Sequence, residues 1–474
     1  MHVGGLGAFG LSVANTPATL GSSRSDPAFG SAKSCILLFP YGSPSSHETF
    51  DPKPEMPNVQ GEMKSIPTAV AGLHVGDRLP RVAQVMDKVT VVRSMTHPYP
   101  LHGLAYAVTG IPTYTPELET RARDKRHWPF IGSVVDYVQR GRSGMATEIP
   151  YNLGLPWLVN SKTDNPAVNA GPFAAFLGSE YDPLWTDFDG SGLHIAPKNT
   201  VAQKKRFRNP FGGTTSTARF HLSPGSELPL DVSFDRMRMR RSLLAQFDRG
   251  RQRLHHGDRV QAWNHQQQLA MSLLMSGKLR MALDIGREPR RVREQYGLHL
   301  FGQGCLAARR LVEAGGKFVT VFWDCFGQFA NGAWDTHQYH YPRMKELLLP
   351  GFDTAYPTLL NDLDARGMLD ETLVIWMSEH GRTPEINSKP GGGREHWSRA
   401  YSVALAGAGI ARGKVVGRTT RDGGEVLDNP VSPKDILATA FYLLGIDPEM
   451  TVPDREGRPH PIAGSGRVRH EFFA

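Results

Sequence analysis

The amino-acid sequence predicts an α/β fold: a mostly parallel sheet with helices packed on both faces. Short apolar runs alternate along the chain with stretches of helical spacing, and a glycine follows the last helical stretch. The chain has 474 residues, of which 40% are hydrophobic and 21% charged, as in ordinary globular proteins. This length allows one large domain or two to three smaller ones, and we expect one, because strands on both sides of a helical segment lead to the same candidate site.

Five apolar runs are expected to be strands of this sheet. They are Cys35–Phe39, Val89–Val92, Lys317–Trp323, Leu373–Met377 and Tyr401–Ala406. The amphipathic stretch Arg343–Arg366 lies between the third and the fourth run, so these segments predict a right-handed βαβ unit. A last helix is predicted over Pro433–Leu444, because Gly445 is a normal helix stop.

The rest of the chain divides by composition. Residues 1–30 are rich in Gly, Ala and Ser and nearly uncharged, which favours an export signal, although the basic start of such a signal is missing. We therefore expect an exported, periplasmic protein; the alternative is a disordered tail on a cytoplasmic one. Residues 31–474 form the predicted domain, with a helical insertion at 226–314 and long loops at 112–130 and 180–225.

Charge and cysteine content limit the classes of function. The net charge is +8, but the basic residues concentrate in 204–208 and 236–253, and helical spacing in the second stretch indicates a solvated helix face rather than a nucleic-acid site. The three cysteines, Cys35, Cys305 and Cys325, cannot build a disulfide framework or a zinc knuckle. No apolar run is long enough to span a membrane. Because the cysteines lack zinc-binding spacing, any metal must be bound by His and carboxylate side chains.

Histidines and acids follow the predicted strands, where ligands bind in open α/β sheets. Because imidazole and carboxylate together suit zinc, manganese or iron, we expect a metal or polar active site at this edge. A single loop histidine is more often structural, and a Ser-His-Asp hydrolase is disfavoured because no G-x-S-x-G elbow occurs. Arg394 and His396 lie just before the fifth predicted strand, and the residues that follow the strands are His47, Glu48, Asp51, His97, His102, Asp335, His337, His340, Glu379, His380 and Arg382.

Several of these segments resemble one known family. The segments GSPSSHETFDPKP, VVRSMTH, WDTH, LVIWMSEHGRTPEIN and GREHW, in this order, are similar to the bacterial family called domain of unknown function 1501. The resemblance covers roughly 31–474. That family in turn resembles the alkaline phosphatase and sulfatase superfamily. The resemblance therefore implies an alkaline-phosphatase-like fold with divalent metals at the carboxyl ends of a parallel sheet.

The same resemblance implies a set of metal ligands. Ser378–Gly381 resembles the Ser-Asp-His-Gly motif of the superfamily, which makes Glu379 and His380 ligands. Asp335 and His337 stand for its Asp and His pair, with His340 as the alternative to His337, and His396 is the late histidine that completes a site. The implied ion is zinc, manganese or calcium. The first strand departs from the pattern, because it ends in Phe39-Pro40-Tyr41-Gly42, and only His47, Glu48 or Asp51 follow where an aspartate is usual.

The nucleophile departs from the pattern as well. Thr109-Gly110 matches the end of the helix that a sulfatase nucleophile opens, which places Pro100 at the nucleophile position. His102 is predicted as a base or ligand, with Ser94 and Thr96 as alternatives. No Cys-x-Pro-Ser-Arg motif occurs, so a formylglycine mechanism is not expected.

These inferences lead to one functional hypothesis and one rival. The first is a metal-dependent hydrolase of phosphate or sulfate esters, acting on an anionic small molecule or a polysaccharide ester. In it His102 and Arg382 are catalytic, and Arg394 and His47 bind substrate. The rival is a degenerate member of the family that binds a sugar or an anionic ligand without turnover. It is favoured by the missing nucleophile and the missing aspartate. A structural or nucleic-acid role comes third.

Overall fold

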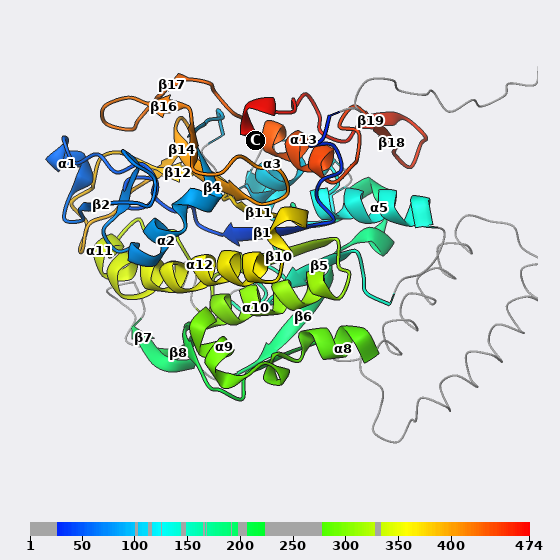
Figure 1. Cartoon of the computed structure of the whole chain (residues 1–474), viewed down its shortest axis with the longest axis horizontal. Coiled ribbons are helices and arrows are strands. Elements are labelled where there is room, and N and C mark those ends of the chain that lie inside the picture. Colours follow the sequence, from blue (N-terminus) through cyan, green and yellow to red (C-terminus); the bar gives the residue numbers. More distant parts are fainter. Residues whose placement is uncertain are drawn as a thin grey trace, which may run out of the picture.

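A nine-stranded sheet runs through the centre of the described residues (Figure 1). The computed structural model describes residues 26–99, 103–111, 116–124, 126–143, 148–164, 166, 168–190, 192–197, 206–222, 277–327 and 333–474. In spatial order the strands are β15 (Lys414–Val416), β4 (Val89–Met95), β14 (Tyr401–Ala406), β11 (Thr372–Trp376), β1 (Ser34–Pro40), β10 (Phe318–Trp323), β5 (Asn152–Leu155), β6 (Leu184–Asp189) and β9 (Arg219–Leu222). Within this sheet only β14 and β9 run antiparallel to their neighbours.

The central strands are apolar on both faces because both faces are covered. In β1 every residue is buried; Ile36 and Leu38 join the core on one side, whereas Cys35, Leu37 and Phe39 join the core on the other. This alternation follows from the two-residue repeat of a strand. A continuous apolar run is therefore what a doubly covered strand requires.

Helices form a layer on each face, as Figure 1 shows. On one side, α10 (Leu300–Glu313) and α12 (Leu349–Ala365) pack on each other and α10 packs on β10 and β1. On the other side lie α3 (Leu104–Thr109), α5 (Ile131–Ser143) and α13 (Pro433–Leu443), whose apolar residues belong to the second core. The smaller helices α8 (Gly277–Leu283) and α9 (Arg290–Tyr296) extend the first layer.

The predicted α/β fold is confirmed, and the five predicted strands correspond to β1, β4, β10, β11 and β14. The predicted βαβ unit is β10, then α11 (His340–Arg343), the π-helix η6 (Met344–Leu348) and α12, then β11, with β1 between the two strands. Ser432 caps the start of the last helix, α13, and its side chain and that of Asp435 form a capping box. The helix is followed by Gly445 at a φ of 70°, the left-handed conformation that makes glycine a helix stop.

The prediction of a long loop at 180–225 is wrong. This segment contains β6, β9 and the hairpin of β7 (Gly192–Pro197) with β8 (Arg206–Thr214). Its strands were missed because they are not uniformly apolar: β6 reads LWTDFD and is only partly buried, as expected near the edge of a sheet. Of the predicted insertion at 226–314, residues 226–276 lie outside the described residues, and its last helix, α10, belongs to the layer that covers the sheet.

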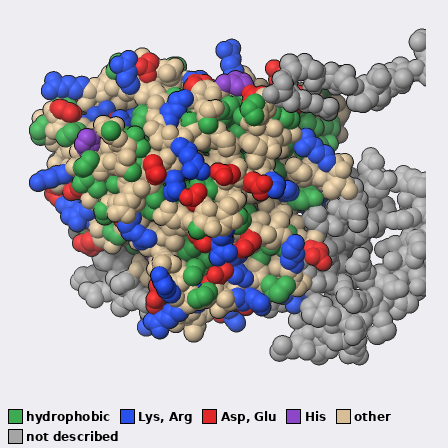
Figure 2. Space-filling model, in the orientation of Figure 1, with side chains coloured by type: hydrophobic (Ala, Val, Ile, Leu, Met, Phe, Trp, Pro, Cys, Tyr) green, Lys and Arg blue, Asp and Glu red, His purple; other side chains and the backbone are tan. Residues whose placement is uncertain are grey.

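Two further expectations concern the chain's surroundings. Residues 1–25 lie outside the described residues, so the export segment stays a prediction. Among the described residues, no helix combines the length and hydropathy needed to cross a bilayer. On the face drawn in Figure 2, Lys and Arg side chains are interspersed with Asp and Glu instead of gathering in one basic patch. The basic stretch 236–253 lies outside the described residues.

Candidate metal centre

Four parallel strands end at one edge of the sheet, and the segments that follow them meet there. β1, β10, β11 and β4 share one direction, so the residues after Pro40, Trp323, Trp376 and Met95 lie at the same edge. A separate pair of antiparallel strands aligns two of the candidate residues. Strand β12 (Gly381–Arg382) pairs with β13 (His396–Trp397), and Arg382 is the partner of His396.

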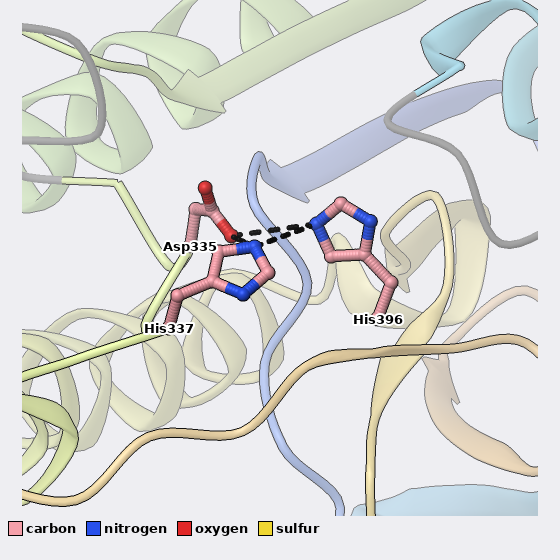
Figure 3. A group of neighbouring side chains, drawn as sticks. All are labelled: Asp335, His337 and His396. Carbon is pink, nitrogen blue, oxygen red and sulfur yellow. Dashed lines mark hydrogen bonds and ion pairs between the residues drawn. The ribbon is translucent and has the colours of Figure 1, made fainter. Parts of the chain in front are cut away.

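Three side chains converge at this edge: Asp335, His337 and His396 (Figure 3). One ligand atom of each lies within 4.8 Å of the others. The Nε2 atom of His337 is 3.0 Å from Asp335 Oδ1 and 2.9 Å from His396 Nε2. His396 Nε2 is 3.6 Å from the same carboxylate oxygen. The structure thus brings together residues as far as 61 positions apart in the sequence, 335 and 396.

Hydrogen bonds hold the two segments that carry these three side chains against each other. The Arg394 N–H donates to the Thr336 carbonyl at 3.1 Å, and the Asn387 side-chain amide donates to the His337 carbonyl at 3.0 Å. Gly393 makes this approach feasible, because a Cβ atom there would lie 1.9 Å from the His337 carbonyl oxygen. The three consecutive glycines at 391–393 therefore serve close chain packing beside the cluster.

Glu395 contacts the Nδ1 atom of the His337 ring. Burial alone would raise the pKa of Glu395, but hydrogen bonds from Lys389 and Asn387 and the contact with His337 lower this pKa to about 2. Glu395 is therefore a carboxylate, and its Oε2 accepts the proton of His337 Nδ1. In the neutral ring the lone pair is then on Nε2, which faces Asp335 and His396.

This donor set fits a divalent cation. Lone pairs of a carboxylate oxygen and of imidazole nitrogens converge at distances of 2.9 to 3.6 Å, and a cation between them would satisfy all of them at once. The side chains of His337 and His396 are 31% and 23% exposed, whereas Asp335 is 8% exposed. One side of the cluster is therefore open to solvent, as in catalytic metal sites that keep a position for water or substrate.

Arg382 lies behind the cluster and does not face the solvent. Its side chain is fully buried, and Nη2 donates to Asp335 Oδ1 at 2.5 Å. The same guanidinium donates to the carbonyl oxygens of Gly42, Ser43 and Arg394. These contacts fix the Asp335 carboxylate and tie it to the loop that follows β1.

His380 lies next to the cluster. Its ring centroid is 4.6 Å from that of His396, and its Nδ1 donates to the Gly381 carbonyl at 2.8 Å, which leaves the ring lone pair on Nε2. Glu379 is buried and accepts hydrogen bonds from Gly42 N–H at 2.8 Å and from the Ser378 hydroxyl. The structure thus places His380 beside His396, and it places Glu379 against the loop after β1.

The two residues predicted to bind substrate, Arg394 and His47, do not lie in the cluster of Asp335, His337 and His396. Arg394 is fully buried; its N–H groups donate to Glu48 and to the carbonyl oxygens of Val59, Thr383 and Pro384. His47 is buried and pairs with the Asp422 carbonyl at 2.8 Å, and burial and the Arg394 charge lower its pKa to about 4. Their roles in substrate binding stay predictions.

The remaining candidates are placed as follows. His340, the alternative to His337, lies in the buried network of Glu48 and Arg394. The Ser94 hydroxyl donates to the Asn429 carbonyl at 2.6 Å. His102 lies outside the described residues.

The structure places two further residues here to which the sequence assigned no role. His97 is buried, and its Nε2 donates to the Glu379 carbonyl at 2.8 Å, which secures the segment that carries His380. Its position just after β4, at the same edge, was the available signal. Glu395 belongs to the quoted GREHW segment, but nothing in the spacing shows that its carboxylate reaches His337.

Comparison of the whole sequence with protein families identifies a family that matches nearly the entire chain. The model of the family described as "Protein of unknown function (DUF1501)" matches residues 32–473. The chain belongs to this family. The predicted resemblance is therefore confirmed for the DUF1501 chain, over nearly its entire length. No curated protein matches its sequence.

Solved structures similar to this DUF1501 chain include a sulfatase, a phosphonate monoester hydrolase and a lipoteichoic acid synthase. A sulfatase from Pseudoalteromonas sp. is 12% identical, with 87% of this chain and 68% of that chain covered and a TM-score of 0.38. The phosphonate monoester hydrolase of Agrobacterium radiobacter is 10% identical, with 93% and 77% covered and a TM-score of 0.36. The lipoteichoic acid synthase LtaP from Listeria monocytogenes is 10% identical, with 92% and 77% covered and a TM-score of 0.34. The case for a site rests on the chain's own side chains.

Proposed function

We propose that this protein is a metal-dependent hydrolase of phosphate or sulfate esters, in which Asp335, His337 and His396 hold a divalent ion. The observation that carries the proposal is the convergence of these three ligand atoms within 4.8 Å at the carboxyl edge of the sheet, with both imidazoles partly exposed. Two imidazoles and one carboxylate favour zinc or manganese over calcium, which takes oxygen ligands.

In this proposal, the side chains around the metal ligands have separate roles. Glu395 orients His337, and Arg382 orients Asp335. When bound, a divalent ion supplies Lewis acidity toward an ester oxygen and lowers the pKa of a water. Because Arg382 is fully buried, it acts in this proposal on Asp335 instead of on the substrate. His380 lies close enough to His396 to serve as a further ligand or as a proton carrier.

The local charges support an anionic substrate. The Asp335 carboxylate is offset by Arg382, the Glu395 carboxylate is offset by Lys389, and the two ligand histidines are neutral when they bind metal. Among these residues the two positive charges of the ion are therefore not compensated. An ester that carries a negative charge, such as a phosphate or sulfate ester of a small molecule or a polysaccharide, would supply the compensation.

Replacement of one ligand tests the proposal. We expect His396→Ala to weaken zinc or manganese binding by more than about 100-fold, beyond the loss caused by removing an outer partner of a ligand, and to abolish turnover. His74→Ala is the control, because His74 is an exposed histidine on β3 (His74–Gly76). Metal content is measured on purified protein, and turnover is screened with aryl phosphates and aryl sulfates. Wild-type protein without a divalent ion, or a fully active His396→Ala variant, would contradict the proposal.

The rival function is binding of a sugar or anionic ligand without turnover. It is favoured by the end of β1, where Pro40, Tyr41 and Gly42 stand in place of a carboxylate ligand. The same screen separates the two functions. Turnover that is lost in His396→Ala excludes the rival, whereas metal-dependent anion binding with no turnover of any ester supports it.

A further inference from the structure

Glu395 joins the two segments that carry the metal ligands. In sequence it precedes His396, and in space its Oε2 contacts His337 Nδ1. Its backbone is anchored as well: the Thr383 N–H donates to the Glu395 carbonyl at 2.9 Å, and the Glu395 N–H donates to the Thr383 hydroxyl at 3.0 Å. The residue is therefore fixed beside one ligand and reaches a second.

The carboxylate of Glu395 is held more firmly than its exposure would suggest. The side chain is 46% exposed, yet Oε1 accepts hydrogen bonds from Asn387 Nδ2 at 2.9 Å and from Lys389 Nζ at 2.8 Å. Because Oε1 has these two donors, Oε2 is left directed at His337. Asn387 also holds the His337 carbonyl at 3.0 Å, so one amide positions both the carboxylate and the backbone of the ligand.

We infer that Glu395 is a positioning residue of the metal site, which holds His337 as the tautomer and in the orientation that direct Nε2 toward Asp335 and His396. This inference rests on the proposed function for the identity of the site. Its physical basis is general: a carboxylate that accepts the second ring N–H of a ligand histidine fixes the ring and makes the ligand nitrogen more basic. Loss of such a partner typically weakens metal binding about 10- to 100-fold.

A purely structural role would give a different result. In that role Glu395 would cross-link the segment between β12 and β13, and its removal would lower stability without a specific effect on metal affinity. Glu425 is a matched control, because it is a glutamate with a side chain 49% exposed that forms an ion pair with Arg399. The comparison of the two glutamates separates the loss of a surface ion pair from the loss of the contact with His337.

The experiment measures zinc affinity of the full chain by competition with a chromophoric chelator. We expect Glu395→Ala to bind zinc about 10- to 100-fold more weakly than wild type. Glu395→Gln should lose several-fold, because its amide oxygen still accepts the Nδ1 proton but lacks the charge, and Glu425→Ala should match wild type. The thermal unfolding midpoint without zinc reports folding. If Glu395→Ala does not fold, the nearly isosteric Glu395→Gln carries the test.

The outcomes separate the inference from the proposed function. Wild-type zinc affinity in both Glu395 variants overturns the inference alone, as does equal weakening in Glu425→Ala. Weaker binding in the Glu395 variants, together with no turnover of any ester by the zinc-loaded wild type, supports the inference and removes the hydrolase. Absence of zinc binding in the wild type overturns both.

Discussion

Two polar clusters lie at the carboxyl edge of the sheet, and both are built from histidine, carboxylate and arginine. In the buried cluster, Glu48 pairs with Arg394 at 2.6 Å and with His340 at 3.3 Å, and all three side chains are fully buried. In the open cluster, Asp335 pairs with Arg382 and lies beside His337 and His396, whose rings are partly exposed. The residue types are nearly the same, but the surroundings differ.

This difference decides what each cluster can do. The Arg394 guanidinium donates its hydrogen bonds to protein acceptors, and burial lowers the pKa of His340. This cluster therefore holds the loop after β1 against the segment around 383–394. Although burial alone would raise the pKa of Glu48, the charge of Arg394 and the contact with His340 hold this pKa well below its usual range. The open cluster instead leaves ligand atoms on a side that solvent reaches. We therefore expect stability to depend on the first cluster and metal binding on the second.

Breaking the buried pair should have the largest effect on stability. Glu48→Ala leaves the Arg394 charge buried without its partner, so the free energy of unfolding should fall by about 3–5 kcal/mol. Urea unfolding measures this loss, and Glu371→Ala is the control, because Glu371 forms an exposed pair with Lys33. Zinc content of the folded variant should equal that of wild type. A loss below 1 kcal/mol would mean that the two clusters do not differ in the way described.

Asp324 sharpens the comparison, because it is a buried acid at the same edge whose described hydrogen-bond donors are neutral. It accepts hydrogen bonds from Trp157 Nε1 and from the N–H groups of Asn160 and Cys325, and burial raises its pKa from 3.8 to about 7. Between about pH 4 and pH 7 the folded state keeps a proton that the unfolded state has lost. Rising pH in this window therefore destabilises the fold, by a total on the order of 4 kcal/mol.

The variant Asp324→Asn removes this titration. Relative to Asp324→Asn, the wild-type free energy of unfolding should fall as the pH rises from 4 to 7 and then stay level. Urea unfolding at several pH values measures the difference. The exposed Asp370, replaced in the same way, should give a curve parallel to that of wild type. Parallel curves for Asp324→Asn and wild type would show that Asp324 titrates normally.

The smallest effect is expected at the outer rim of the open cluster. Lys389 pairs with Glu395 at 2.8 Å, and both side chains are about half exposed. Lys389→Met should cost about 0.2–1 kcal/mol of stability and less than about 10-fold in zinc affinity, because exposed pairs are weak and Asn387 still holds the carboxylate. Lys345→Met, which breaks the pair with Glu62, is the control. A zinc loss as large as that expected for Glu395→Ala would place the lysine itself in the site.

Much of the fold follows from local patterns in the chain. The five predicted strands are buried on both faces, so their apolar runs are continuous and easily recognised. Strands β6 to β9 lie toward one edge of the fold and mix polar with apolar residues, so their pattern resembles that of loops. The helix α13 was predictable at both ends, because Ser432 and Gly445 act through local geometry.

The site was predictable only in part. The chain order places Asp335, His337, Glu379, His380 and His396 after strands of one sheet, and this alone predicts a polar edge. His337 and His340 are equally good candidates by spacing, but Tyr339 has a φ of 50°, and the chain there turns His340 into the buried cluster. Arg382 and Arg394 are both arginines near the edge, and only their burial shows that their partners are protein groups.

The sequence by itself determined the α/β class, the order of the central strands along the chain, the DUF1501 family and the edge at which polar side chains gather. These follow from periodicity and from motifs, which are local. Tertiary structure alone decided which histidines meet, which acids are neutralised and which arginines are buried. Those properties depend on contacts between segments far apart in the chain, such as Glu395 with His337 and Glu48 with Arg394, and on burial, which changes the cost of a charge.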